Sequence, residues 1–215
     1  MLKTKIKASA VNNLTDARYF AAREVEWLGF RFSGDPEAAI SLMAAKAIAE
    51  WVDGVKLVGE FDFATVEEIV NADEQLHFDA VQVGMYTPAE TLEKLPNLTF
   101  IKEVVVENDS SEAEIEAHLA AYASCCGYFL LDYTKAGINW DAVKTGKPLS
   151  LNFLKRLISE NKILLALDFQ ASEAQSVIET LHPEGLSLTG GTEEKVGFKS
   201  FDELDEIFDK LEYVG

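Results

Sequence analysis

Two polar side chains stand at the ends of apolar runs that are typical of buried strands. Lys7 lies next to the end of the run 4–8, and Asp132 closes the run 128–132. A lysine in such a place can bind an anion, or act as a base or Schiff-base former if its pKa is lowered, or simply extend its ammonium into solvent. A partly buried carboxylate can serve as a general acid or base, or cap the following loop. We predict that Lys7 and Asp132 form the catalytic pair.

Further polar residues lie at or near the ends of other apolar runs. They are Arg31, Glu60, Gln82, Lys102 and Asp168. The last run is followed by the loop Thr189-Gly190-Gly191-Thr192. Glycines let backbone N–H groups approach an anion, so this loop is a candidate phosphate site, with a plain turn as the alternative.

The elements that must position these residues alternate along the chain. Apolar or β-rich runs occupy residues 4–8, 27–32, 55–61, 79–83, 99–106, 128–132, 162–169 and 185–188. Helical patterns separate them, as expected for parallel strands, whose crossover connections need roughly a dozen residues or more. Helix-start signals occur at Thr87-Pro88-Ala89-Glu90, at Ser111 with Glu114, and at Asp35-Pro36, and a further helix is expected from Leu151 to Glu160.

Eight β/α units in 215 residues predict an α/β fold, a single-domain (β/α)8 TIM barrel over residues 1–215. A doubly wound sheet is the alternative, but it would more commonly bring a glycine-rich first turn, which ASAVNNL is not. In a barrel, the active site lies where the strands end. His77 and His182 precede strands and His118 lies within a helix, so neither a histidine triad nor a zinc site is expected.

The composition argues against several classes of partner. The net charge is −18 and Lys and Arg do not cluster, so nucleic acid is not an expected partner. No apolar run approaches the roughly 20 residues that cross a bilayer, and the chain starts with no apolar signal segment. We therefore expect a cytoplasmic protein, monomer or homodimer, with no metal or cofactor and with the adjacent Cys125 and Cys126 reduced.

The ordered motifs resemble the phosphoribosylanthranilate isomerase family of the ribulose-phosphate-binding barrels. Matching segments are Lys5-Ile6 with LTDARYFAA (14–22), LGFRF (28–32), VQV (81–83), Ile101-Lys102, LLD (130–132), Gly137 with Trp140, and Gly190-Gly191-Thr192-Glu193 with Gly197-Phe198-Lys199. The family counterparts of the first and last are KICG…L-x-DA-x-x-AA and SSGVE…G-x-K-D. The likeness is spread in order over nearly the whole chain.

The resemblance implies an Amadori-type isomerisation in tryptophan biosynthesis, in which a phosphorylated ribosylamine opens and becomes an aminoketose. The family's acid is the aspartate of LLD, here Asp132, and its base is the cysteine of KICG, where this chain has Lys7. The remaining residues predicted to bind the phosphorylated ligand are Lys5, Arg31, Gln82, Lys102, Asp168, Thr189, Gly190, Gly191 and Thr192.

The chain departs from the family at several of these positions. The arginine expected in the loop after the second strand is missing from SGDPEAA, and Arg31 could replace it only if it faces the barrel. The glycine pair after the seventh strand has become Leu167-Asp168. Three functions stay open: a divergent isomerase, a non-catalytic paralogue that binds a phosphorylated metabolite, and a Schiff-base lyase or aldolase that uses Lys7.

Overall fold

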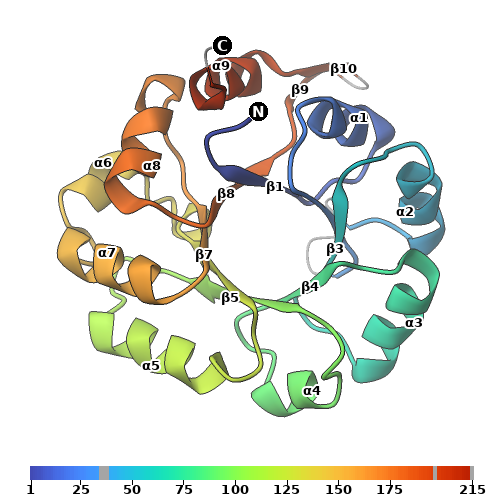
Figure 1. The fold of residues 1–215 in the computed structure, drawn as a ribbon, viewed down its shortest axis with the longest axis horizontal. Coiled ribbons are helices and arrows are strands. Elements are labelled where there is room, and N and C mark those ends of the chain that lie inside the picture. The colour runs from blue at the N-terminus through green and yellow to red at the C-terminus, as the bar shows by residue number, and fades with distance from the viewer. Residues whose placement is uncertain (34–38, 196–197, 214–215) are drawn as a thin grey trace.

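The computed structural model describes residues 1–33, 39–195 and 198–213. Within these residues, eight parallel strands close into a barrel in chain order (Figure 1). The strands are β1 (Lys5–Ser9), β2 (Trp27–Arg31), β3 (Lys56–Phe61), β4 (Ala80–Val83), β5 (Phe100–Val105), β6 (Tyr128–Asp132), β7 (Ile163–Ala166) and β8 (Gly185–Thr189). The predicted (β/α)8 barrel and its eight strands are confirmed.

Helices form a ring outside the strands (Figure 1). They are α1 (Leu14–Ala22), α2 (Leu42–Ala49), α3 (Val66–Leu76), α4 (Ala89–Glu93), α5 (Glu112–Tyr122), α6 (Trp140–Lys144), α7 (Leu151–Glu160), α8 (Ala174–Leu181) and α9 (Asp202–Leu211), with the 3₁₀ turns η1 (Thr134–Ala136) and η2 (Ala171–Glu173). The predicted helix at 151–160 and the capping box of Ser111 with Glu114 are confirmed. No helix among the described residues is long and apolar enough to cross a membrane.

The sequence predicts that α2 and α4 each start close to a proline. Ser41 caps α2, whereas the expected start at Asp35-Pro36 lies outside the described residues. Pro88 is the N-cap of α4 and makes no side-chain cap bond. The hydroxyl of Thr87 instead donates to the carbonyl oxygen of Asp62, 3.4 Å away. Thr87 therefore ties its loop to the neighbouring one, and the predicted capping box there is wrong.

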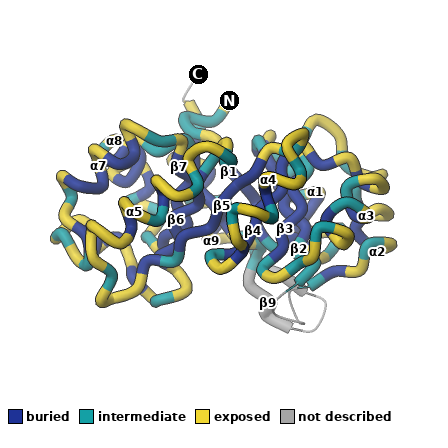
Figure 2. The backbone as a smooth tube through the Cα atoms, turned by 90° about the horizontal axis from the view of Figure 1, so that it is seen from below, coloured by how far each residue is buried: buried dark blue, intermediate teal, exposed yellow. Residues whose placement is uncertain are grey.

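Two apolar layers lie on the two sides of the barrel wall, because successive strand residues point to opposite faces. The outer layer packs the strands against the helices and includes Ile6, Phe20 and Phe208. The inner cluster consists of Trp27, Val58, Ala80, Ile101, Leu130, Leu164 and Ala166. The strands run through the buried centre of the molecule (Figure 2). The inward positions become polar towards the strand ends, and this change positions the candidate site.

The two faces of the barrel differ. In Figure 2 the chain ends lie on one side of the barrel, and the N-terminal residues lead directly into β1, so the strands begin on this side. The strand β9 (Thr192–Lys195) pairs antiparallel with β10 (Phe198–Ser200) directly after β8. The side opposite the chain ends is therefore the face where the barrel strands end and where active sites of this fold lie.

Candidate active site

A cavity of about 680 Å³ opens at the C-terminal ends of the strands. Its polar wall includes Ser9, Arg31, Gln82, Glu103, Asp132, Lys135, Asp168, Ser187, Thr189, Gly190 and Gly191. Such a volume lies within the roughly 300–1,000 Å³ of small-molecule sites. The structure thus brings together most of the predicted site residues, namely Arg31, Gln82, Asp132, Asp168, Thr189, Gly190 and Gly191.

Asp132 ends β6 with its side chain directed into the barrel and only 6% of the residue exposed. Its Oδ1 accepts hydrogen bonds from the backbone N–H of Thr134 (2.8 Å), from the Thr134 hydroxyl (2.6 Å) and from the backbone N–H of Lys135 (3.1 Å). Both interpretations made from the sequence are therefore compatible with this carboxylate. One oxygen caps the turn η1, and the residue also lines the cavity.

Lys7 points into the barrel but is fully buried and does not line the cavity. Its ammonium contacts the Glu60 carboxylate and donates to Ser9 Oγ, 2.7 Å away. Gly29 of β2 makes this arrangement possible, because a Cβ there would lie 2.1 Å from Glu60 Oε1. The expectation that Lys7 reaches the mouth needs correction: its amine is held in the buried interior of the barrel by a carboxylate.

Arg31 faces the barrel, which is the condition for it to meet an anionic group of a ligand. Its Nε lies 3.6 Å from Glu60 Oε2, and its side chain is 22% exposed. Burial by itself would raise the pKa of Glu60, but Lys7, Arg31 and the backbone N–H of Ala10 hold that pKa below its ordinary value. Glu60 therefore stays ionised and links a buried cation to one at the cavity surface.

Lys102 lies on the other face of β5 from the cavity, because its neighbours Ile101 and Glu103 point inward. Its ammonium donates to the carbonyl oxygens of Gly84 (2.8 Å), Met85 (2.9 Å) and Thr87 (2.8 Å). It also lies 4.1 Å from the centre of the Tyr122 ring, and burial lowers its pKa to about 8. The predicted placement of Lys102 in the mouth is wrong; Lys102 holds the loop between β4 and α4.

Replacing Lys102 by methionine should destabilise the protein by about 1–3 kcal/mol, because three carbonyl oxygens lose a buried donor. The free energy of unfolding in urea measures the loss. Amide hydrogen exchange should be faster in residues 84–87 than in the wild type, with the exchange of β1 and β8 little changed. A loop that exchanges at the wild-type rate would contradict this role.

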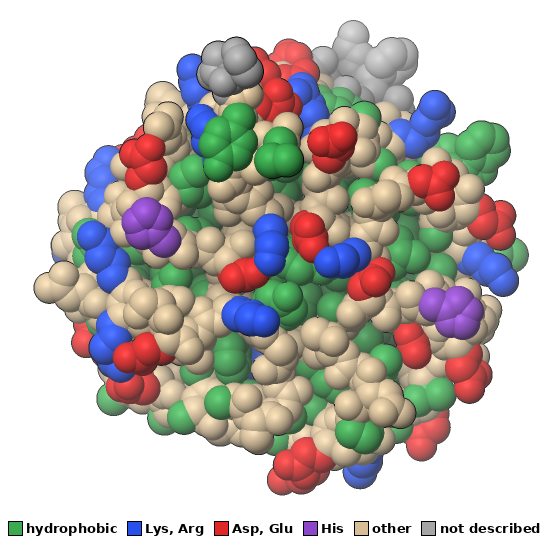
Figure 3. All heavy atoms as spheres, in the orientation of Figure 1, with side chains coloured by type: hydrophobic (Ala, Val, Ile, Leu, Met, Phe, Trp, Pro, Cys, Tyr) green, Lys and Arg blue, Asp and Glu red, His purple; other side chains and the backbone are tan. Residues whose placement is uncertain are grey.

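Lys5 lies at the opposite end of the barrel from the cavity, because it begins β1. Its ammonium pairs with Glu184, which precedes β8, and lies 5.8 Å from the Trp27 ring centre. Figure 3 shows this face, where the strands begin, with Lys or Arg and Asp or Glu side chains adjacent near its centre. The predicted ligand contact of Lys5 is therefore not supported by its position.

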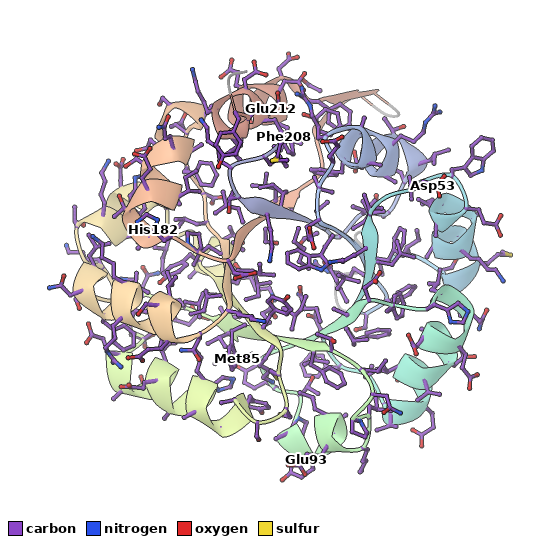
Figure 4. All side chains as sticks on the ribbon, viewed as in Figure 1. Asp53, Met85, Glu93, His182, Phe208 and Glu212 are labelled. Carbon is purple, nitrogen blue, oxygen red and sulfur yellow. The ribbon has the colours of Figure 1, made fainter. Side chains whose placement is uncertain are left out.

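The histidines lie where the sequence places them. His77 and His182 are the left-handed C-caps of α3 and α8, each ahead of a strand. Figure 4 shows His182 beside α8, outside the ring of strands. His118 lies within α5. Across the described residues, no three His, Cys, Asp or Glu side chains gather in a group that could hold a metal ion.

Gln82 and the loop after β8 supply neutral polar groups. The side chain of Gln82 points inward from β4, and its Oε1 is buried without a hydrogen-bond partner among the described residues. A buried acceptor of this kind is suited to a ligand hydroxyl or N–H. Thr189 is exposed at the rim, and Gly190 lies so close to Asp16 that a Cβ would be 2.3 Å from Asp16 Oδ2. The side chain of Thr192 lies outside the described part.

Two cavity residues, Glu103 and Lys135, were not predicted, and Glu60 was noted at a strand end but not assigned to the site. Glu103 is 3% exposed, lines the cavity, and has both carboxylate oxygens 2.7 Å from Lys135 Nζ. Burial raises its pKa above the ordinary range, although Lys135 acts in the opposite direction. The signal available in the sequence was the Lys102-Glu103 pair at the end of an apolar strand, of which one member has to face inward.

The mouth is acidic overall in the part of the chain that the structure describes. Its cations are Arg31 and Lys135, and its carboxylates are Glu103, Asp132, Asp168, Asp202 and Glu203. A ligand anion is favoured only close to an opposite charge in such a site. An anionic group therefore fits best next to Arg31 or Lys135.

Comparison with solved structures identifies the class of this protein as a (β/α)8 barrel. The isomerase structure from Thermotoga maritima matches with a TM-score of 0.77 and 22% identity, over 97% of this chain and 98% of that one. A phosphoribosyl anthranilate isomerase in complex with reduced 1-(o-carboxyphenylamino)-1-deoxyribulose 5-phosphate matches with a TM-score of 0.74 and 22% identity, over 97% and 98% of the two chains.

Sequence comparison then gives the family. The model of the N-(5'-phosphoribosyl)anthranilate isomerase family matches residues 6–210. The N-(5'-phosphoribosyl)anthranilate isomerase of Caldanaerobacter subterraneus subsp. tengcongensis is 22% identical over 212 residues, which cover 96% of this chain and 97% of the relative. The chain belongs to the N-(5'-phosphoribosyl)anthranilate isomerase family, as its motifs predicted.

Proposed function

We propose that this protein catalyses an Amadori-type isomerisation of a phosphorylated ribosylamine, the reaction of its family in tryptophan biosynthesis. The observation that carries the proposal is the position of Asp132, a buried carboxylate at the end of β6 that lines a cavity of about 680 Å³. Ring opening needs an acid at the ring oxygen, and a positioned carboxyl group can supply it. Asp132 is that acid.

The other groups of the cavity bind the substrate. Arg31 meets one of its anionic groups, and the Oε1 of Gln82 accepts from a sugar hydroxyl or from the amine. The loop from Thr189 to Gly191 offers backbone N–H groups for the phosphate. Asp168 also lines the cavity and opposes a second negative charge close to it, so the phosphate contacts the loop at a point away from the Asp168 carboxylate.

We do not assign the role of the general base to Lys7. A base must come within hydrogen-bond reach of the proton that it removes. The Lys7 amine is fully buried and occupied by Glu60 and Ser9, and the same contacts disfavour the alternative of a Schiff base on Lys7.

The proposal is tested by incubating the purified protein with phosphoribosylanthranilate and following the aminoketose product by chromatography. We expect turnover above the buffer rate, and competition by the reduced deoxyribulose 5-phosphate analogue. Absence of turnover at every pH between 6 and 9 would refute the isomerase proposal.

A non-catalytic paralogue that binds a phosphorylated metabolite is the second candidate. The observation in its favour is the Lys7–Glu60 pair, which fills the place of the family's cysteine with a closed ion pair. This candidate predicts a raised melting temperature with sugar phosphates and no conversion of them. The cytoplasmic location and the state of monomer or homodimer stay predictions for either function.

A further inference from the structure

A second buried carboxylate lies beside Asp132 in the cavity wall. Glu103 of β5 pairs with Leu130 of β6, and Val105 pairs with Asp132. Glu103 and Asp132 are therefore two residues apart along neighbouring strands and both line the cavity. Parallel strands lie about 4.8 Å apart, so carboxylates on side chains of this length share one part of the mouth.

The turn η1 connects these two carboxylates. The backbone N–H of Lys135 donates to Asp132 Oδ1 at 3.1 Å, and the side chain of the same lysine returns to Glu103, with Nζ 2.7 Å from both oxygens. Lys135 is 39% exposed at its side chain, whereas that of Glu103 is 3% exposed. A ligand in the cavity can therefore reach the ammonium without first reaching the carboxylate.

The groups around Glu103 shift its pKa in opposite directions. Burial is the largest influence and raises its pKa, and the carboxylates of Asp132 on β6 and Asp62 after β3 raise it further. Lys135 on η1 lowers it, and Gln82 on the adjacent β4 is neutral. A buried carboxylate that loses its cation gains proton affinity. An anionic group that binds the Lys135 ammonium would cause that loss.

We propose that Glu103 is the proton acceptor of this site, and that Lys135 holds it in an ion pair until an anionic group of the ligand takes over the ammonium. The inference rests on the proposed isomerisation and assigns the base that Lys7 cannot supply. It also gives a role to the cavity cation that the family motifs did not indicate.

The proton balance of the reaction closes with two carboxyl groups. Asp132 gives its proton to the ring oxygen as the C1–O bond breaks and the nitrogen lone pair forms a C1=N bond. Glu103 then removes the C2 proton; the C2–H electron pair forms C1=C2, and the C1=N pair returns to nitrogen. The enol hydroxyl at C2 returns a proton to Asp132, and Glu103 delivers its proton to C1. Substrate and product are isomers, and both carboxyl groups end as they began.

A direct titration tests the acceptor without requiring turnover. Carboxyl ¹³C NMR of the full chain should give Glu103 a midpoint above that of free glutamate. Ribose 5-phosphate should raise it further by about one pH unit, since it competes for Lys135. Lys135→Met should give the same rise without the probe and abolish the response to it. The exposed Glu107, after the end of β5, is the control and should not respond. An ordinary midpoint in Lys135→Met, or a flat response of Glu103 to the probe, would overturn the proposal.

The kinetic test separates this inference from the isomerase proposal. With phosphoribosylanthranilate, Glu103→Gln should lower kcat by about 10²–10⁴-fold and change KM by only a few-fold, as for loss of a general base. Glu107→Gln should leave both unchanged. If the wild type turns over and Glu103→Gln keeps kcat within threefold, the role of Glu103 is refuted while the isomerase stands. If the wild type is inactive, the isomerase fails, and the titration decides whether Glu103 is a ligand-controlled proton acceptor.

Discussion

Replacing Lys7 by methionine should destabilise the protein by about 3–5 kcal/mol at pH 7, because breaking one side of a buried ion pair leaves an uncompensated charge. The Glu60 carboxylate is 2% exposed and would keep only Arg31, 3.6 Å away, as a neighbouring cation. Equilibrium unfolding in urea measures the change. The size of the effect follows from the buried carboxylate that is left without its cation, rather than from the lost contacts of lysine.

Two further variants separate this cause from a general effect of losing a lysine. Lys7→Met combined with Glu60→Met should recover most of the stability, since apolar side chains often replace a buried ion pair at little cost. Lys56→Met is the matched control, because Lys56 and Glu26 form an exposed pair at the other end of the barrel. It should cost less than about 1 kcal/mol. Equal losses for the two single variants would contradict the buried-pair explanation.

The loss of stability in Lys7→Met should depend on pH, because Glu60 titrates differently in the two proteins. In the wild type the pKa of Glu60 is lowered below 4.5. Its contribution to stability is thus complete above that pH and is lost as the pH falls through the lowered value. In Lys7→Met, burial instead raises the pKa of Glu60, so the cost is largest at neutral pH and shrinks as the carboxyl group takes a proton. The difference between the two proteins should be smaller at pH 5 than at pH 7.

The expected loss of stability concerns the position at which the family motif KICG has a cysteine and this chain has Lys7. Lys7 at that position points into the buried interior of the barrel, and its partner Glu60 belongs to β3, two strands away. Gly29 on the strand between them leaves the space for the carboxylate. Lys7 and Glu60 fit one another, whereas Gly29 belongs to the segment LGFRF that matches the family, so the change from cysteine to lysine is best understood together with the carboxylate at position 60. The single substitution Lys7→Cys would leave Glu60 without its buried cation, in the same way as Lys7→Met does.

The fold could be predicted because its signals are local and repeated. Most apolar runs, such as 128–132, carry a polar residue at or near their end and are followed by a helical pattern. The barrel rule then places strand ends on one face, and this placed Arg31, Gln82 and Asp132 correctly around the cavity. The order of the strands needed no pairing information, because in this fold it is the order of the chain.

The direction in which individual side chains point was harder to predict than the fold. The run 99–106 is buried on both sides, so alternation of polar and apolar residues does not tell which of Lys102 and Glu103 points inward. The family motif favoured the lysine, whereas the structure turns it to the loop carbonyls. Glu60 and Lys7 are separated by 53 residues, and their contact depends on strand register and on the space at Gly29. Such a contact is visible only in three dimensions.

Asp132→Asn should lower kcat for phosphoribosylanthranilate by about 10²–10⁴-fold, as expected for loss of a general acid. KM should stay within a few-fold, because the amide has nearly the shape of the carboxyl group. The free energy of unfolding should change little, since an amide Oδ1 can still accept from the N–H groups of Thr134 and Lys135 and from the Thr134 hydroxyl. The variant thus removes the exchangeable proton while it keeps the cap of η1.

Two controls decide what a loss of activity means. Thr134→Val removes the 2.6 Å hydroxyl bond to Asp132 Oδ1 but keeps the carboxyl group, so it should reduce kcat far less than Asp132→Asn does. Asp141→Asn, on the exposed side of α6, should leave kcat and KM unchanged. If Asp132→Asn converts substrate within threefold of the wild-type rate, Asp132 serves only as a cap. If neither protein converts substrate but a sugar phosphate raises both melting temperatures equally, the cavity binds a phosphorylated metabolite without acting on it.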